Sequence, residues 1–221
     1  LVHDEDVRPL ATPGAIGVSL VAATLSDLLL QGRIRVEQGR IYPITGRTDP
    51  AAEPFSTEFL QVLAEERIPR LAEVLRGVRI DLRNEPHDLY RWVYEHTRSG
   101  LVEAGLLHQQ RRAVRGSRYQ LAERELISSI REQVNGRVRH PHDPADLTLD
   151  VLCALAWALD LHTILSMPCT AHEADRSLRD ITGRIPGRAG PGSPLAILPH
   201  LIPLVRRTVA DLARPRSGVD Q

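Results

Sequence analysis

The sequence contains no lysine: all 28 of its basic residues are arginines, and 28 acidic residues balance them. Functions that depend on a lysine are therefore excluded. A P-loop requires the lysine of its G-K-[ST] motif, a protein kinase the lysine of its nucleotide-binding strand, and a pyridoxal enzyme or aldolase a Schiff-base lysine. Abundant alanine, leucine and proline beside the arginines are typical of a GC-rich genome, which would explain this bias without a functional cause.

Cysteine is almost absent as well. Cys153 and Cys169 lie in or beside apolar sequence without C-x-x-C spacing, so both are predicted to be small core residues in a reducing, cytoplasmic compartment. The longest apolar stretch, 147–167, contains two aspartates and His162, which would be costly in lipid. We therefore expect a buried core helix in a soluble protein. Because Leu1 is not a methionine, we expect the sequence to begin inside a longer protein.

The net charge of zero conceals a strong segregation along the chain. Residues 67–139 carry 15 arginines against 9 acidic residues, a net charge of +6, and residues 183–221 carry +4. Residues 1–66 and 140–182 each carry −5. A basic block can attract anions although the whole chain is neutral. Solvated helix faces with ion pairs would give the same pattern, so both interpretations stay open.

Apolar residues recur at helical spacing along most of the chain. Proline, serine and glycine mark the expected ends of the helices. The predicted helices begin at Pro13, Ser56, Pro69, Pro86, Glu123, Leu147, Ala171 and Leu195. The stretch from Arg184 to Pro194, rich in glycine and proline, is predicted to be a loop.

Alternating apolar residues on both sides of a turn predict two short β-hairpins. The first covers residues 33–42, and the second covers 106–121 with Gly116 and Ser117 as turn residues. The second hairpin has an arginine-rich tip formed by Arg111, Arg112, Arg115 and Arg118. The predicted fold class is mainly α: a single helical-bundle domain over residues 1–221, around a central apolar helix, with two short β-hairpins.

No arrangement of residues predicts catalysis. The motifs G-x-S-x-G and H-E-x-x-H are absent, as is G-x-G-x-x-G after a strand. Residues 14–19 open a helix whose free N–H groups could hold a phosphate, but close helix packing is the favoured use of Gly17. We therefore expect a protein that is not an enzyme and needs no cofactor.

The densest group of ligand-type residues is His140, His142, Asp143 and Asp146. H-x-H is a metal-binding spacing on a strand, where alternate side chains share a face. Here a proline separates the histidines in a proline-flanked loop, and no further ligand follows at a familiar spacing. A solvated loop is favoured, and no metal site is predicted. His162, on the expected core helix, is predicted to be a buried histidine with its hydrogen bonds satisfied.

A helix followed by a basic hairpin is also the arrangement of winged-helix DNA-binding proteins, and the arginine-rich tip would suit phosphate contacts. The near-neutral pI of 7.3 disfavours this function. The helix before the second hairpin carries Glu95, His96 and Glu103, which make a poor surface for reading bases. DNA binding therefore remains an alternative.

Four segments, in order, carry a family resemblance. Residues 25–36 (LSDLLLQGRIRV) resemble an L-x-x-L-A-L-x-G-R-I/L-x-L signature, and residues 91–107 resemble an arginine-bearing helix that ends in L-V-x-x-G-I/V-L before a hairpin. Residues 149–165 resemble an apolar core helix, and residues 173–181 resemble an R-x-x-x-L helix. Together these motifs resemble the Golgi phosphoprotein 3 family, which has many actinobacterial members.

The resemblance implies a helical bundle with a flat basic face that binds an anionic phospholipid headgroup, phosphatidylinositol 4-phosphate in the eukaryotic members. Arg91 matches one arginine of the family's headgroup pocket, and Tyr94 stands where the family has a second. Thr12 and Val21 stand where the family has a tryptophan and another arginine. Paired, charge-assisted hydrogen bonds from arginine suit this chemistry.

Arg8, Arg83 and Arg98 are the candidates to complete the headgroup site. The family's hairpin tip is apolar, whereas the tip here is rich in arginine, which suits contact with anionic headgroups or with another subunit. We expect a non-enzymatic, cytoplasmic protein, peripheral to an anionic phospholipid membrane. Other proteins or a second copy of the chain are further partners to consider, and nucleic acid is disfavoured. A protein-interaction scaffold without lipid binding is the third interpretation.

Overall fold

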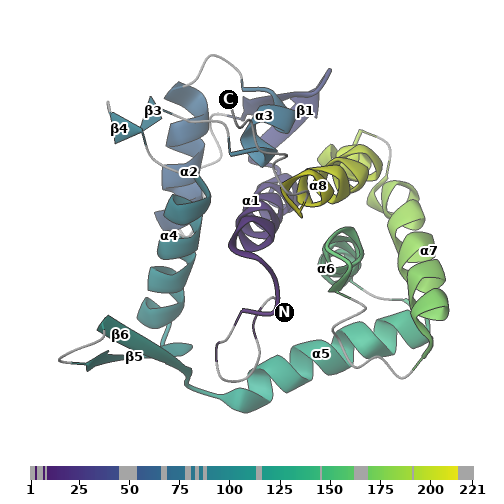
Figure 1. Ribbon diagram of the computed structural model, residues 1–221. Helices are drawn as coiled ribbons and strands as arrows, with labels where there is room; N and C mark the ends of the chain where they lie inside the picture. The colour runs from purple at the N-terminus through teal and green to yellow at the C-terminus, as the bar shows by residue number, and fades with distance from the viewer. Residues whose placement is uncertain are drawn as a thin grey trace, which may run out of the picture.

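The computed structural model shows a helical bundle with small sheets at its edge (Figure 1). It describes residues 3, 7, 9–44, 54–65, 69–77, 81–82, 85–86, 89–112, 116–144, 146–161, 169–190 and 192–213. The helices in these residues are α1 (Pro13–Leu30), α2 (Pro54–Glu65), α3 (Leu71–Leu75), α4 (Leu89–Glu103), α5 (Arg124–Arg139), α6 (Leu147–Ala158), α7 (Ala171–Ala189) and α8 (Leu198–Ala213), with a 3-10 helix, η2 (Pro194–Ile197), before α8. The predicted mainly α fold is confirmed.

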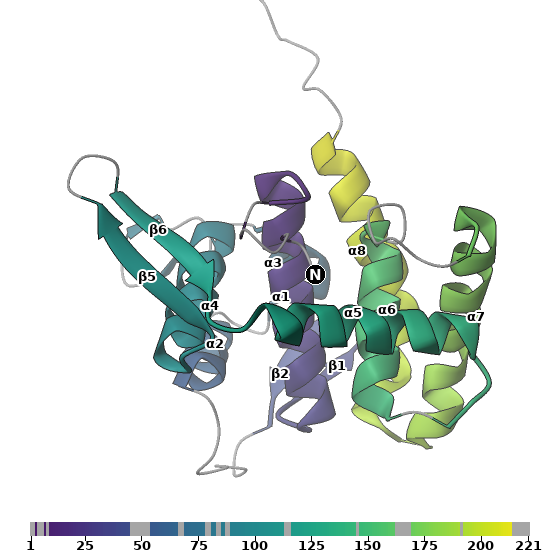
Figure 2. The same ribbon diagram turned by 90° about the horizontal axis from the view of Figure 1, so that it is seen from below.

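Three antiparallel pairs of strands accompany the described helices. They are β1 (Ile34–Glu37) with β2 (Arg40–Pro43), β3 (Asp81–Leu82) with β4 (Glu85–Pro86), and β5 (Leu107–Arg112) with β6 (Gly116–Leu121). The β5–β6 hairpin projects from one side of the bundle, and α5 leads from it across to α7 (Figure 2). Both predicted hairpins are present, and the β3–β4 pair is an addition that the sequence patterns did not reveal.

Helix α1 lies in the middle of the bundle and packs against α3, α4, α6 and α8 (Figure 1). Its residues Val18, Val21 and Leu28 have no exposed surface. Helix α6 is packed against α1, α5, α7 and α8, and its residue Ala154 is fully buried. The apolar helix predicted from Leu147 is thus a core helix, and α1 shares the central position with it.

Helix α1 is long and apolar enough to cross a membrane, with a mean hydropathy of 1.6. In the fold, however, 61% of this segment is buried. A core helix passes the same test of length and composition, and the packing of α1 against four other helices agrees with that role.

The start of α1 and its contact with α4 follow from three local features. The Thr12 hydroxyl accepts a hydrogen bond from the Ala15 amide at 3.3 Å and caps the helix. A Cβ atom on Gly17 would lie 2.4 Å from Cβ of Tyr90, so only glycine allows α4 to approach this closely. The Tyr90 hydroxyl donates to the Leu75 carbonyl at 2.5 Å, which ties α3 to the same place. The helix-packing use of Gly17 is therefore confirmed.

The first hairpin forms where the sequence predicts it. Ile34 pairs with Pro43 and Glu37 with Arg40, so Gln38 and Gly39 form a two-residue turn. Both turn residues have positive φ, 51° and 74°, as the twist of a tight hairpin requires. Ile41 is fully buried, which anchors the hairpin against the core.

Three predicted helix starts are wrong: those at Ser56 and Pro86, and the one at Pro69, because Arg70 is the N-cap of α3 and the helix begins at Leu71. Ser56 does not cap a helix: α2 begins at Pro54, and Ser56 is a buried residue inside its first turn. Pro86 does not begin a helix either, because it lies in β4 opposite Asp81, and α4 begins at Leu89. Proline is compatible with both the first turn of a helix and a short edge strand, so its position alone did not decide between them.

The predicted loop from Arg184 onward is wrong for residues 184–189, because α7 continues to Ala189 through Pro186. Leu178, Ile181 and Ile185 are fully buried at helical spacing, and this burial outweighs the backbone hydrogen bond that Pro186 cannot donate. Helix α6 ends at Ala158, before the end of the apolar stretch at residue 167. His162 lies outside the described residues.

A buried ion-pair network joins α5, α6 and α7. Asp150 is fully buried, and its carboxylate accepts from Nε of Arg137 at 2.7 Å and from a guanidinium nitrogen of Arg188. Burial first, and the Asp150 charge second, raise the pKa of Cys153 to about 12. Cys153 is thus the inert core residue that the sequence predicts, whereas Cys169 is partly exposed.

Candidate functional site

The outward side of α4 carries three of the predicted site residues. Arg91, Tyr94 and Arg98 follow one another at three- and four-residue spacing, so they share one side of the helix, here called the α4 outer face. The Arg91 side chain is 78% exposed, and its Nε donates to Oε1 of Glu95 at 3.1 Å. This exposed pair is worth about 0.3–0.5 kcal/mol, so it does not fix the guanidinium in place.

The Arg98 guanidinium lies against two tyrosine rings from different elements. Its carbon Cζ is 5.6 Å from the centre of the Tyr94 ring on α4 and 4.7 Å from that of Tyr119 on β6. Both contacts are within the range of cation–π attraction. The hairpin β5–β6 is thereby held beside the α4 outer face, next to the place where the chain passes from α4 into β5.

Two further described residues reach this region. The ring of His3 lies 6.1 Å from the ring of Tyr94, and the His3 carbonyl accepts from a guanidinium nitrogen of Arg131 on α5 at 3.4 Å. The α4 outer face is therefore bordered by the β5–β6 hairpin and by His3, which also contacts α5. Sequence reasoning missed Tyr119, because only the folded hairpin brings it to Arg98.

The strands of the arginine-rich hairpin extend further toward its tip than predicted. Gly116 and Ser117 are strand residues, opposite Arg112 and Arg111, and not the turn. This correction follows from strand pairing, which extends as far as Arg112 opposite Gly116. Arg118 is exposed and lies opposite Gln110. Three predicted residues lie outside the described residues, so the structure does not place them: Arg8, Arg83 and Arg115.

The two family positions on or beside α1 do not join the α4 outer face. Thr12 is the exposed N-cap of α1, and Val21 is fully buried in the core. Of the predicted headgroup residues, the structure therefore brings together Arg91 and Tyr94, which stand at family positions, and Arg98, a candidate to complete the site.

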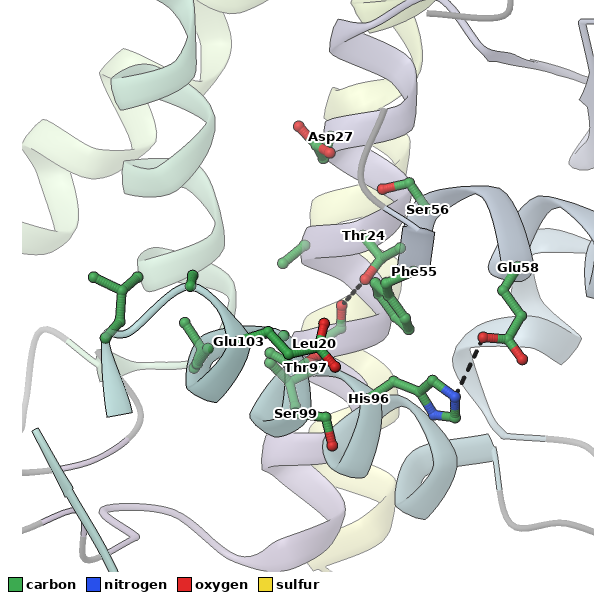
Figure 3. Close-up of a pocket in the computed structure, with 15 residues that line it drawn as sticks. Leu20, Thr24, Asp27, Phe55, Ser56, Glu58, His96, Thr97, Ser99 and Glu103 are labelled. Atoms are coloured by element: carbon green, nitrogen blue, oxygen red, sulfur yellow. Dashed lines mark hydrogen bonds and ion pairs between the residues drawn. The ribbon is translucent and has the colours of Figure 1, made fainter. Parts of the chain in front are cut away.

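The other side of α4 borders a cavity of about 640 Å³ between α1, α2 and α4 (Figure 3). Its wall contains apolar residues such as Leu20 and Phe55, three carboxylates and His96. The acidic residues are Asp27, Glu58 and Glu103. Nε2 of His96 lies 3.3 Å from Oε2 of Glu58. None of the described residues that line this cavity is an arginine, so it is chemically unlike the α4 outer face.

The predicted ligand-type cluster after α5 is dispersed into other contacts. Asp146 caps α6, accepting from the Leu149 amide at 2.6 Å, and His142 contacts the guanidinium of Arg184. Within the part of the chain that the structure describes, no three His, Cys, Asp or Glu side chains are grouped so that they could hold a metal ion.

The fold and the α4 outer face define the class of protein: a helical bundle with exposed arginines beside a projecting hairpin. The chain belongs to the Golgi phosphoprotein 3 (GPP34) family, whose model matches residues 1–194. The suspected family is thus confirmed. No curated protein matches the chain.

Proposed function

We propose that this chain is a non-enzymatic protein that attaches peripherally to anionic phospholipid through the α4 outer face and the β5–β6 hairpin. Family membership supports the class of function. The observation that carries the proposal is the geometry of Arg98. Its guanidinium is positioned by Tyr94 and Tyr119, about two helical turns from the exposed Arg91.

The contacts of both arginines leave hydrogen-bond donors for a phosphate. Arg91 uses Nε for Glu95, while its two terminal nitrogens carry four more N–H donors. In a cation–π contact Arg98 engages the rings through the face of its guanidinium, and its in-plane N–H groups remain directed outward. Planar guanidinium groups held in this way suit the bidentate binding of phosphate oxygens.

The spacing of the two arginines supports a headgroup with more than one phosphate. Seven residues separate Arg91 from Arg98, which is about 10.5 Å along a helix. A phosphoinositide such as phosphatidylinositol 4-phosphate has a phosphodiester and a phosphomonoester, so each arginine would have its own phosphate. Arg118 and the other hairpin arginines would add general attraction to an anionic surface, about 1 kcal/mol for each arginine near it.

Flotation with vesicles tests this proposal. The chain is expected to float with phosphatidylcholine vesicles that contain phosphatidylinositol 4-phosphate, and not with phosphatidylcholine alone, at low salt. Arg91→Ala should weaken this binding about fivefold, the equivalent of about 1 kcal/mol. Arg76→Ala is the matched control, because Arg76 is an exposed arginine of the same basic block at the end of α3.

Equal flotation with neutral and anionic vesicles would refute lipid recognition. Equal effects of the two substitutions would refute a defined site at Arg91. Retardation of duplex DNA that disappears with rising salt would favour the DNA-binding alternative. Binding to neither lipid nor DNA would favour the interaction scaffold.

A further inference from the structure

Arg33, which follows α1 directly, is an arginine whose charge is buried. Its relative exposure is 7%, so more than nine-tenths of it is removed from solvent. Nitrogen Nη2 donates to the Thr57 hydroxyl at 3.3 Å, while nitrogen Nη1 is buried without any hydrogen-bond partner. The described residues offer Arg33 no carboxylate, unlike Arg137, whose buried guanidinium is paired with Asp150.

An uncompensated buried charge is expensive. The cost is several kcal/mol for an isolated ion, and a partner of opposite charge with good hydrogen bonds offsets it. Arginine retains its proton even when it is buried, so Arg33 cannot avoid this cost by becoming neutral. A group of negative charge beside Nη1 would offset this cost.

Arg33 reaches a second feature that favours an anion, the first turn of α2. Thr57 belongs to that turn, and α2 is a helix of 12 residues. The main-chain N–H groups of Phe55 and Ser56 precede the first intrahelical hydrogen bond, and the helix dipole places partial positive charge at this end. The Arg33 guanidinium thus contacts the turn of α2 that carries these two amide groups and the exposed residue Thr57.

We propose that Arg33 and the first turn of α2 form a binding site for a phosphate group. The donors come from three directions: the guanidinium, the main chain of α2 and the hydroxyl of Thr57. A tetrahedral oxyanion with several oxygens can accept from all of them, in the way that phosphates bind at helix N-termini. Thr57 is exposed, so the site is open to solvent on that side.

This site is separate from the α4 outer face. Tyr90, the neighbour of Arg91, touches α1 at Gly17. From Gly17 to Leu30 the helix extends for 13 residues, about 20 Å, and Arg33 lies beyond its end. A substitution at Arg33 therefore tests phosphate binding without changing Arg91 or Arg98.

Thermal unfolding of the full chain in inorganic phosphate, against sodium chloride of equal ionic strength, tests the proposal. Phosphate at about five times its Kd should raise Tm by about 2–4 °C. In Arg33→Met this rise should be lost, and the substitution itself should not lower Tm in chloride, because it removes an unpaired buried charge. Arg35→Met is the matched control: Arg35 is an exposed arginine two residues away, paired with Glu37 at 3.3 Å, and should retain the full rise.

Thr57→Val provides a second variant that keeps the charge of Arg33. It should reduce the rise in Tm by about half or more, since it removes one donor and leaves Arg33 without its described partner. An unchanged Tm of the wild-type chain in phosphate would overturn the proposal. So would a rise that persists in both Arg33→Met and Thr57→Val.

Vesicle flotation of Arg33→Met then identifies the source of the phosphate group. If the variant loses phosphate stabilisation but still binds vesicles containing phosphatidylinositol 4-phosphate, the ligand is a soluble phosphate compound. If it loses both, the ligand is a lipid headgroup. Failure of flotation by the wild-type chain would remove the proposed lipid function and leave the phosphate site at Arg33 to stand on the thermal data.

Discussion

The two sides of α4 differ in chemistry: one carries arginines and a tyrosine, with Glu95 paired to Arg91, and the other carries Glu103 and His96. On the outer face, Arg91 is 78% exposed and Arg98 stacks on Tyr94 and Tyr119. On the inner side, His96 and Glu103 border the cavity with Asp27 and Glu58. The two sides are formed by residues that alternate within 15 positions of one helix.

This contrast shows that the net charge of a segment does not describe a surface. The block 67–139 carries +6, yet the cavity that it helps to form is acidic, because α1 and α2 contribute Asp27 and Glu58. The helical period sorts the arginines of α4 to the outside. Of the two sides of α4, an anionic ligand is therefore matched to the outer face, and not to the side that carries His96 and Glu103.

Gly17→Ala is expected to have the largest effect on stability, because it disturbs the packing of α4 and therefore both of its sides. The added methyl group would lie 2.4 Å from Cβ of Tyr90, so α1 and α4 must separate. We expect a loss of about 1–3 kcal/mol in the free energy of unfolding, measured by urea denaturation. Gly136→Ala in α5 is the control: its Cβ would meet nothing within 4 Å, and it should stabilise the chain by about 0.5–1 kcal/mol. Equal effects of the two substitutions would contradict this description of the contact.

An intermediate effect is expected from substitutions that distinguish the two sides of α4. Arg98→Ala should weaken binding to anionic vesicles about fivefold, whereas Glu103→Gln on the cavity side should leave it unchanged or slightly stronger. Tyr119→Leu, which keeps the arginine but removes its stacking partner, should fall between the two. A larger effect at Glu103 than at Arg98 would assign lipid binding to the cavity side.

The smallest effect is expected from Glu58→Gln, which alters the contact between the Glu58 carboxylate and His96. The Glu58 side chain is 52% exposed, so the pair should contribute no more than about 0.5 kcal/mol to stability. Urea denaturation in 0.1 M and 1 M NaCl should show that even this contribution disappears at high salt. A loss that persists at 1 M NaCl would mean that the cavity wall depends on this contact.

Local sequence patterns predicted the parts of the fold that local interactions decide. The first hairpin formed as expected, because Gln38 and Gly39 can take the positive φ of a two-residue turn. Helix α1 begins at Pro13 as predicted, because Thr12 can cap it. The predicted loop at Arg184 failed, since the burial of Ile185 keeps α7 helical through Pro186.

The candidate sites also combine features that the local sequence predicts with features that only the folded structure reveals. The α4 outer face could be predicted, because Arg91, Tyr94 and Arg98 are close in sequence. The stacking of Arg98 on Tyr119 could not, since the two residues meet through the fold of the hairpin. The cavity was missed for the same reason: its wall combines α1, α2 and α4, and no motif links them.

The sequence by itself determined the helical class, the first hairpin, the family and the arginines available for binding an anion. Tertiary structure decided what each arginine does: Arg91 is exposed, Arg137 is neutralised by Asp150 in the core, and Arg33 is buried with one nitrogen unpartnered. The physical reason is that charge belongs to a residue, whereas exposure and pairing depend on which distant segments pack over it.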